Sequence, residues 1–166
     1  MAQNYRIEIA TIDDLPELMS LQKRAFKPVA DKVGWSDIPQ MVDTLDASID
    51  AFGEDTILKM LSDDNRIIGS VRGNVKDGSL YIGRLMVDPE YQGRGLGRML
   101  QRKLESMFQF SREWLCSYVK DVDTYRFYQR DGFVEYDVYE VGNGVMAAHM
   151  EKISKISHPQ VIAYSK

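Results

Sequence analysis

The sequence of 166 residues contains one cysteine, Cys116, and only two histidines, His149 and His158. A single cysteine excludes an intramolecular disulfide framework and a cysteine-only metal cluster. With so few histidines a zinc site is not expected either, so we predict no bound metal. Cys116 lies in an apolar strand pattern with no histidine beside it, and we expect it to be buried and structural rather than a nucleophile.

Long apolar runs are also lacking. No segment approaches the length needed to span a bilayer, and the N-terminal MAQNYRIEI lacks the basic start and apolar core of a signal peptide. We therefore expect no membrane partner and a cytoplasmic location. The net charge is -4, from 21 basic and 25 acidic residues, which argues against nucleic acid as the main partner.

What the sequence does contain is an ordinary globular composition, with 44% hydrophobic and 28% charged residues. A chain of this length most simply forms one domain, which we place at residues 1–153. Residues 154–166 show no periodicity and are expected to form a C-terminal tail.

The first third of the chain predicts one strand and two helices. Residues Tyr5–Ala10 alternate polar and apolar side chains, as a strand does, and the helical apolar stripe that follows runs to about Phe26. The segment Lys27–Pro39 contains two prolines and predicts a loop. A second helix is expected over about Gln40–Phe52.

The rest of the chain predicts six strands and two helices, the helices starting near Gly95 and at a cap formed by Asp123. The order is β-α-α-β-β-β-α-β-α-β-β, which indicates an α/β fold with a single mixed central sheet and helices on both faces. The six strands are expected at Thr56–Leu61, Arg66–Val75, Leu80–Val87, Glu113–Val119, Phe133–Val141 and Val145–Ile153.

A glycine-rich turn joins the strand Leu80–Val87 to the helix after it. The turn consists of Gln92, Gly93, Arg94, Gly95, Leu96 and Gly97. A P-loop needs lysine and then Ser or Thr after the last glycine, and a dinucleotide fingerprint needs Gly or Ala where Arg98 stands, so neither fits. A pyrophosphate site remains, in which backbone N–H groups, the helix N-terminus and the cations of Arg94 and Arg98 hold an anion. A turn that only reverses the chain is the alternative.

Two motifs together resemble the GNAT superfamily of N-acetyltransferases. The glycine turn, preceded by Val87-Asp88-Pro89, is similar to the family pattern Gln/Arg-x-x-Gly-x-Gly/Ala. Residues 121–133, DVDTYRFYQRDGF, are similar to its second block, although Asp121 stands in place of Asn and Thr124 in place of Ala. The resemblance covers about residues 5–153 and implies the GNAT acyl-CoA N-acyltransferase fold.

The resemblance implies that the protein moves the acetyl group of acetyl-CoA to a primary amine by direct attack in a ternary complex. Residues 92–98 would bind the pyrophosphate, and the backbone of Leu85, Met86 and Val87 would bind the pantetheine arm where this strand splays from the next. Asp121 stands where Asn usually contacts that arm. Tyr128 occupies the position of the general acid that protonates the leaving thiolate, and we favour this role over simple packing against the sheet.

The acceptor half of the reaction is less defined. The strand Leu80–Val87 contains no acid that could act as a base, so proton removal through water and binding of a neutral amine both stay open. In the family, segments corresponding to 25–55 and 136–148 shape the acceptor site, and the acidic excess of the first would attract a protonated amine. We favour a small or amino-acid-like amine, with a protein or peptide acetyltransferase, or a non-catalytic acyl-CoA sensor, as alternatives. The family also often forms homodimers.

Overall fold

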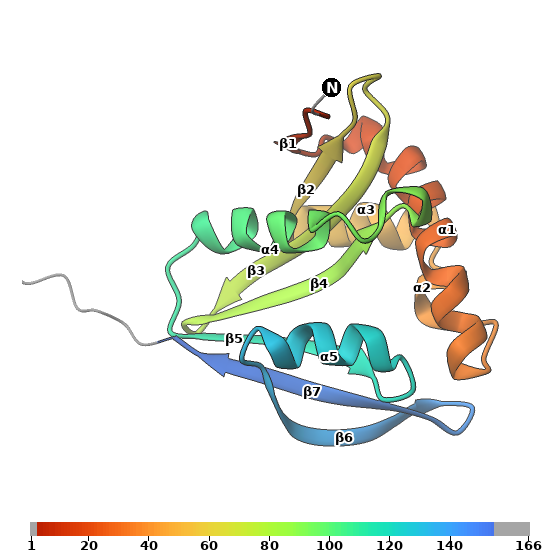
Figure 1. Cartoon of the computed structure of the whole chain (residues 1–166), viewed down its shortest axis with the longest axis vertical. Coiled ribbons are helices and arrows are strands. Elements are labelled where there is room, and N and C mark those ends of the chain that lie inside the picture. The colour runs from red at the N-terminus through yellow and green to blue at the C-terminus, as the bar shows by residue number, and fades with distance from the viewer. Residues whose placement is uncertain (1–2, 155–166) are drawn as a thin grey trace, which may run out of the picture.

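The computed structural model describes residues 3–154, which form a seven-stranded sheet flanked by helices (Figure 1). The strand order is β1-β2-β3-β4-β5-β7-β6. All neighbouring strands are antiparallel except β4 and β5, which are parallel. The mixed α/β sheet predicted from the sequence is therefore confirmed. The tail expected over residues 154–166 lies, apart from Ser154, outside the described residues.

The elements follow the predicted order closely. The strands are β1 Arg6–Ile9, β2 Thr56–Leu61, β3 Ile67–Lys76, β4 Ser79–Val87, β5 Arg112–Tyr118, β6 Val134–Gly142 and β7 Val145–Ile153. The α-helices are α1 Leu15–Val33, α2 Pro39–Val42, α3 Leu45–Glu54, α4 Leu96–Ser106 and α5 Val122–Arg130, and two 3-10 turns, η1 and η2, span Ile12–Asp14 and Pro89–Tyr91.

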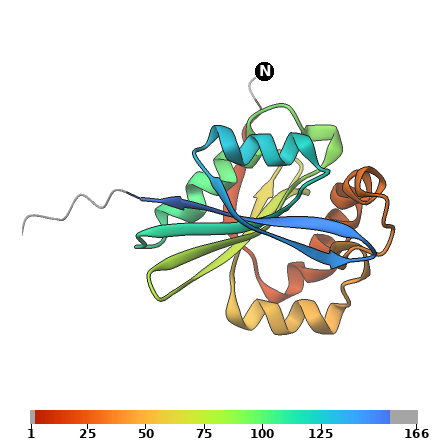
Figure 2. The same cartoon turned by 90° about the horizontal axis from the view of Figure 1, so that it is seen from below.

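Helices cover both faces of the sheet, with α4 and α5 on one face and α1 and α3 on the other (Figure 2). The neighbours Ile67 and Ile68 in β3 are both almost fully buried, the first in the cluster with α1 and the second in the cluster with α4. Successive side chains of a strand point to opposite faces, so this central strand needs apolar residues throughout. Among the described residues, no helix is both long and apolar enough to cross a membrane.

The first helix is longer than predicted. The prediction of a loop over residues 27–39 is wrong for residues 27–33, which are helical. Helix α1 continues through Pro28 to Val33 and ends at Gly34, whose φ of 75° is left-handed. Proline lacks the N–H donor of one helical hydrogen bond. The helix tolerates this loss because Ala30 and Val33 bury their side chains against the sheet end.

The second helix is interrupted. Instead of one helix over residues 40–52, α2 ends at Val42 and α3 starts at Leu45. Thr44 separates them because its hydroxyl accepts a hydrogen bond from the N–H of Ala47 at 3.2 Å, which caps α3. The cap of α5 also differs from the prediction, since its N-cap is Asp121 rather than Asp123.

Candidate active site

A β-bulge distorts β4 in its second half. Two residues of β4, Arg84 and Leu85, lie opposite the single residue Val71 of β3, and Arg84 has a left-handed φ of 48°. The extra residue reverses the alternation of the strand, so that Ile82 faces α4 whereas Met86 packs against α1. The bulge adjoins residues 85–87, where the family resemblance implies that this strand splays from the next.

The strands β4 and β5 separate just before this bulge. Beyond Tyr81 and Trp114 they share no backbone pairing, and each continues with hydrogen bonds only to its other neighbour. The predicted splay of the two strands is therefore present, and backbone N–H and C=O groups along both edges remain available to an occupant. The three pairs that join the strands are Ser79 with Arg112, Leu80 with Glu113 and Tyr81 with Trp114.

A groove of about 500 Å³, here called the main groove, leads to this opening. It is bounded by α1, the second half of β4, the glycine turn and the start of α5. Ten of the eleven residues expected to bind the cofactor line it, together with Tyr128. These ten are Leu85, Met86, Val87, Gln92, Gly93, Gly95, Leu96, Gly97, Arg98 and Asp121.

Arg94 is the exception. Its guanidinium donates to the Gln3 side chain at 2.6 Å and to the backbone oxygen of Glu90 at 3.2 Å, and it lies over the ring of Tyr91. Arg98, by contrast, lines the groove, stacks 4.0 Å from the Phe127 ring centre and pairs with Asp131, the C-cap residue of α5. Arg98 is therefore the cation of the turn that is held at the groove.

The glycine turn presents an open backbone to the main groove. Gly93 and Gly95 have φ values of 76° and 77°, and a Cβ added at either position would meet no atom within 4 Å. Gly95 is the N-cap of α4, so the first N–H groups of this helix have no helical acceptor. Free N–H groups, the positive end of the helix and Arg98 together make an anion site.

Lys32 of α1 reaches across the main groove to the start of α5. Its Nζ lies 3.2 Å from Asp121 Oδ1 and 3.2 Å from Asp123 Oδ2, and the Asp121 side chain is only 4% exposed. Partial burial disfavours the ammonium, but the hydrogen bonds and charges of the two aspartates outweigh it and raise the pKa of Lys32 above its usual value. This pair stabilises a buried carboxylate at the position where the family has Asn.

Tyr128 reaches the place where the main groove enters the sheet. It is 6% exposed, and its ring packs edge-on against Phe127 and Phe133. Burial raises the pKa of Tyr128 above that of an exposed phenol, so the hydroxyl remains protonated. The side chain is thus a core residue whose neutral hydroxyl lies at the cavity wall.

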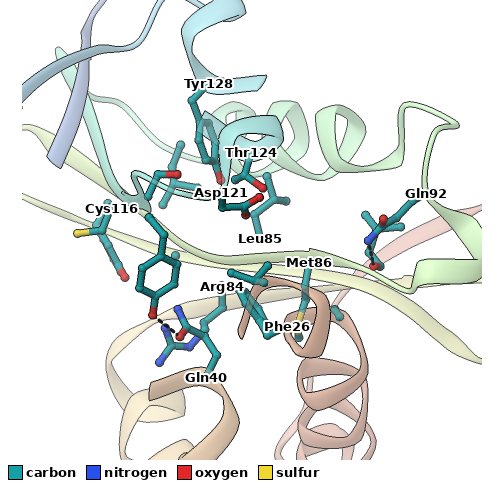
Figure 3. A pocket seen from close by; sticks show the side chains of 18 residues that line it. Phe26, Gln40, Arg84, Leu85, Met86, Gln92, Cys116, Asp121, Thr124 and Tyr128 are labelled. Carbon is teal, nitrogen blue, oxygen red and sulfur yellow. Dashed lines mark hydrogen bonds between the residues drawn. The ribbon is translucent and has the colours of Figure 1, made fainter. Parts of the chain in front are cut away.

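The opening between β4 and β5 contains a cavity of about 180 Å³, here called the sheet cavity (Figure 3). It shares Leu85, Asp121 and Tyr128 with the main groove. On its other side it shares Arg84 and Cys116 with a third cavity of about 190 Å³, here called the aromatic pocket. Three cavities, each sharing lining residues with the next, therefore lie in a row from the glycine turn to the far side of the sheet, and this row is here called the passage.

The aromatic pocket contains Tyr118 and Tyr139, for which the sequence allowed a substrate slot or sheet packing equally, and Tyr81 and Arg84, which the sequence did not single out. Its rings come from Tyr81, Tyr118 and Tyr139, and the hydroxyl of Tyr118 donates to the side-chain oxygen of Gln40 at 2.8 Å. Arg84 lines it as well, and could have been noticed as the only charged residue in the apolar run of β4.

Cys116 is not buried, contrary to the prediction, and also lines the aromatic pocket. Its surroundings still desolvate the thiol and raise its pKa, an effect only partly offset by the hydrogen bond from Tyr139. A thiol that stays protonated is a poor nucleophile. Among residues 3–154 no group of three or more His, Cys, Asp or Glu is arranged to hold a metal ion.

Comparison with known proteins agrees with this geometry. Residues 55–135, which run from β2 into β6 and include the glycine turn and Tyr128, match the family model described as Acetyltransferase (GNAT) domain. No curated protein matches the chain by sequence. Residues 55–135 are thus a GNAT acetyltransferase domain, and the class of protein that this domain defines is the acetyl-CoA-dependent N-acetyltransferases.

Solved structures share the fold at low sequence identity. The PaiA N-acetyltransferase of Thermoplasma acidophilum, solved with coenzyme A, is 17% identical with a TM-score of 0.73, over 91% of this chain and 99% of that one. The ribosomal-protein-S18-alanine N-acetyltransferase of Escherichia coli is 19% identical with a TM-score of 0.75, over 95% and 99%. The spermidine N-acetyltransferase of Vibrio cholerae, solved with CoA and spermine, is 17% identical with a TM-score of 0.67, over 90% and 95%.

Proposed function

We propose that this chain acetylates the primary amine of a small, amino-acid-like acceptor, by direct attack on acetyl-CoA in a ternary complex. The observation that carries the proposal is the passage, the row of three neighbouring cavities from the glycine turn to the aromatic pocket, with Tyr128 lining two of them where donor and acceptor would meet. Two structurally similar N-acetyltransferases that were solved with coenzyme A support a cofactor in the main groove.

The donor would enter through the main groove. Its pyrophosphate would lie on the N–H groups of Gly93, Gly95 and the first turn of α4, with Arg98 beside it. The pantetheine arm would extend along Leu85–Val87, whose edge has no strand partner on the β5 side. This placement brings the thioester into the sheet cavity.

The chemistry then needs a carbonyl activator and a proton donor. The attacking nitrogen forms a C–N bond with the acetyl carbon, and a backbone N–H near the bulge would stabilise the oxyanion that develops. Collapse of the tetrahedral intermediate breaks the C–S bond, and the thiolate takes a proton from Tyr128. The proton lost by the amine leaves to solvent and finally returns to the phenolate.

Cys116 offers a different route, through an acetyl-enzyme. The raised pKa of its thiol does not favour this route. His149 lies opposite Cys116 in β7, but its Nδ1 pairs with Asp137, and the thiol accepts a hydrogen bond from Tyr139 instead. Direct transfer needs only the two substrates to occupy the passage together.

The test combines two measurements on the purified chain. A calorimetric titration with acetyl-CoA is expected to show binding, and a thiol-release assay is expected to show turnover with small amines or amino acids. The panel includes spermidine and short peptides with free N-termini. Binding without thiol release for any acceptor would contradict an enzymatic role and favour a sensor, and release with the peptides alone would favour a protein acetyltransferase.

A further inference from the structure

Arg84 has no role in the donor chemistry proposed above, and its surroundings give information about the acceptor. We propose that its guanidinium binds a carboxylate of the acceptor, so that the substrate is an amino carboxylate, a small molecule with a free carboxylate beside its amine. The inference rests on the proposed function and names the substrate class for it.

Arg84 lies on the acceptor side of β4. Figure 3 shows Asp121, Thr124 and Tyr128 on one side of the strand and Arg84 with Gln40 on the other. Arg84 lines both the sheet cavity and the aromatic pocket. A group bound to it would therefore lie next to the path by which an amine reaches the thioester.

The Arg84 guanidinium is held in place by Asp43, and one of its buried donors lacks a partner among the described residues. Its Nη2 donates to Asp43 Oδ2 at 2.9 Å, and Gln22 donates to the same oxygen at 2.9 Å. Gln22 also donates to the backbone oxygen of Gln40 at 2.9 Å, which fixes this group of side chains between α1 and α2. The Nε of Arg84 is buried and has no acceptor among the described residues, so its donor capacity is only partly used.

The backbone at this position indicates that the side chain matters. A φ of 48° favours glycine or asparagine, and a long side chain adopts it at a steric cost. Strain of this kind persists where the surrounding structure over-determines it, which is common at ligand sites. Since the bulge itself would form more easily with glycine, the arginine is better explained by what its guanidinium binds.

The charges around the aromatic pocket agree with an anionic partner. Arg84 is the only charged residue that lines this pocket, and none of the acidic residues of segment 25–55 lines it. Several of those acids are instead occupied by cations of the protein, such as Asp43 by Arg84 and Asp55 by Arg72. The prediction that this segment attracts a protonated amine is therefore not supported at the pocket itself, where a polyamine would meet a fixed guanidinium.

The test uses matched acceptors. Thiol release from acetyl-CoA is measured with the standard α-amino acids one at a time, and with the carboxamide of each. Hydrogen bonds to a charged partner are strong enough to give the acids an advantage of about tenfold or more in kcat/KM over their amides. Thiol release with the amides alone, or equal values for the two series, would overturn the inference and leave the proposed function intact. No release with any member of either series would overturn both.

Two variants assign the preference to Arg84. Arg84→Asn removes the guanidinium but suits the left-handed backbone, and it is expected to lower kcat/KM for amino acids about tenfold while leaving the amides unchanged. Arg84→Lys keeps the positive charge but lacks the planar, paired donors of the guanidinium. Its kcat/KM for amino acids should lie between those of the parent and of Arg84→Asn. Acetyl-CoA titration of each variant serves as the folding control. If Arg84→Asn lowers kcat/KM for the amino acids and for their amides alike while cofactor binding is retained, Arg84 does not bind the carboxylate.

Discussion

Lys32 and Asp121 are paired across the main groove, with 3.2 Å between Nζ and Oδ1, although they lie 89 residues apart in the sequence. The family motif has Asn at position 121, a neutral side chain that needs no counter-charge. A buried carboxylate at this place needs a cation nearby, and α1 supplies one from the opposite wall of the groove. The departure from the motif and the lysine are thus two parts of one arrangement.

A double-mutant cycle tests this pairing. Lys32→Met leaves the Asp121 carboxylate without its ammonium and is expected to lower the free energy of unfolding by about 1 kcal/mol, a modest value because Lys32 is partly exposed and screened. Adding Asp121→Asn, which restores the family residue, should recover most of that loss. Urea denaturation of the four proteins gives the coupling, and additive effects would show that the two side chains act independently.

The backbone of the glycine turn gives a second prediction, with a control inside the chain. Gly95 and Gly34 have φ values of 77° and 75°, and both have open space where a Cβ would lie. Gly95→Ala and Gly34→Ala should each lower the free energy of unfolding by about 1 kcal/mol, since both force alanine into a left-handed conformation. Only Gly95→Ala should weaken acetyl-CoA binding in calorimetry. Equal affinities in the two variants would place the pyrophosphate elsewhere.

The acid role of Tyr128 is tested by removing its hydroxyl. Tyr128→Phe keeps the ring packing against Phe127 and Phe133 and should lower kcat by roughly a hundredfold or more while leaving acetyl-CoA affinity nearly unchanged. Tyr125→Phe is the matched control on the same helix, because the Tyr125 hydroxyl bonds to Glu135 at the surface. Unaltered turnover in Tyr128→Phe would leave the ring with a packing role only.

The raised pKa of Glu113 predicts that the free energy of unfolding depends on pH. Burial and the neighbouring Glu105 raise the pKa of Glu113 to about 7, although Lys152 lies 3.1 Å from it. Because this pKa is raised above the unfolded value, the folded state binds the proton more tightly, and the stability from Glu113 is lost as the pH rises from about 4.3 through 7. Glu113→Gln should therefore be more stable than the parent at pH 8, by on the order of 1 kcal/mol, with the difference shrinking at pH 5. Thermal unfolding at the two pH values measures it, and a difference independent of pH would contradict the raised pKa.

The sequence was informative where structure depends on local pattern. The apolar run and turn chemistry of β2 and β7 predicted their bounds, and the glycine turn together with Tyr128 predicted a donor site whose residues line the main groove. The sequence was insufficient where tertiary packing determines where an element ends. Helix α1 passes Pro28 because burial of the following turn outweighs a missing hydrogen bond, which no local signal reports.

The acceptor side could not be predicted for a related reason. The left-handed backbone of Arg84 follows from how β3 and β4 pair, and the register of two strands is not encoded in either strand alone. The acidic residues of segment 25–55 were counted as free charges, but Asp43 and Asp55 are occupied by arginines of β3 and β4. Composition gives the number of charges and not their partners.

The short pairing between β4 and β5 has a mechanical consequence. Only three residue pairs join the strands β1–β4 to the strands β5–β7, so the two parts of the sheet share a short seam. The pantetheine arm carries amide groups of its own, and in the splay it would hydrogen-bond to both free edges. Binding of the acetyl donor would then lengthen that seam and stiffen the sheet, so that the protein is most rigid when it is loaded for transfer.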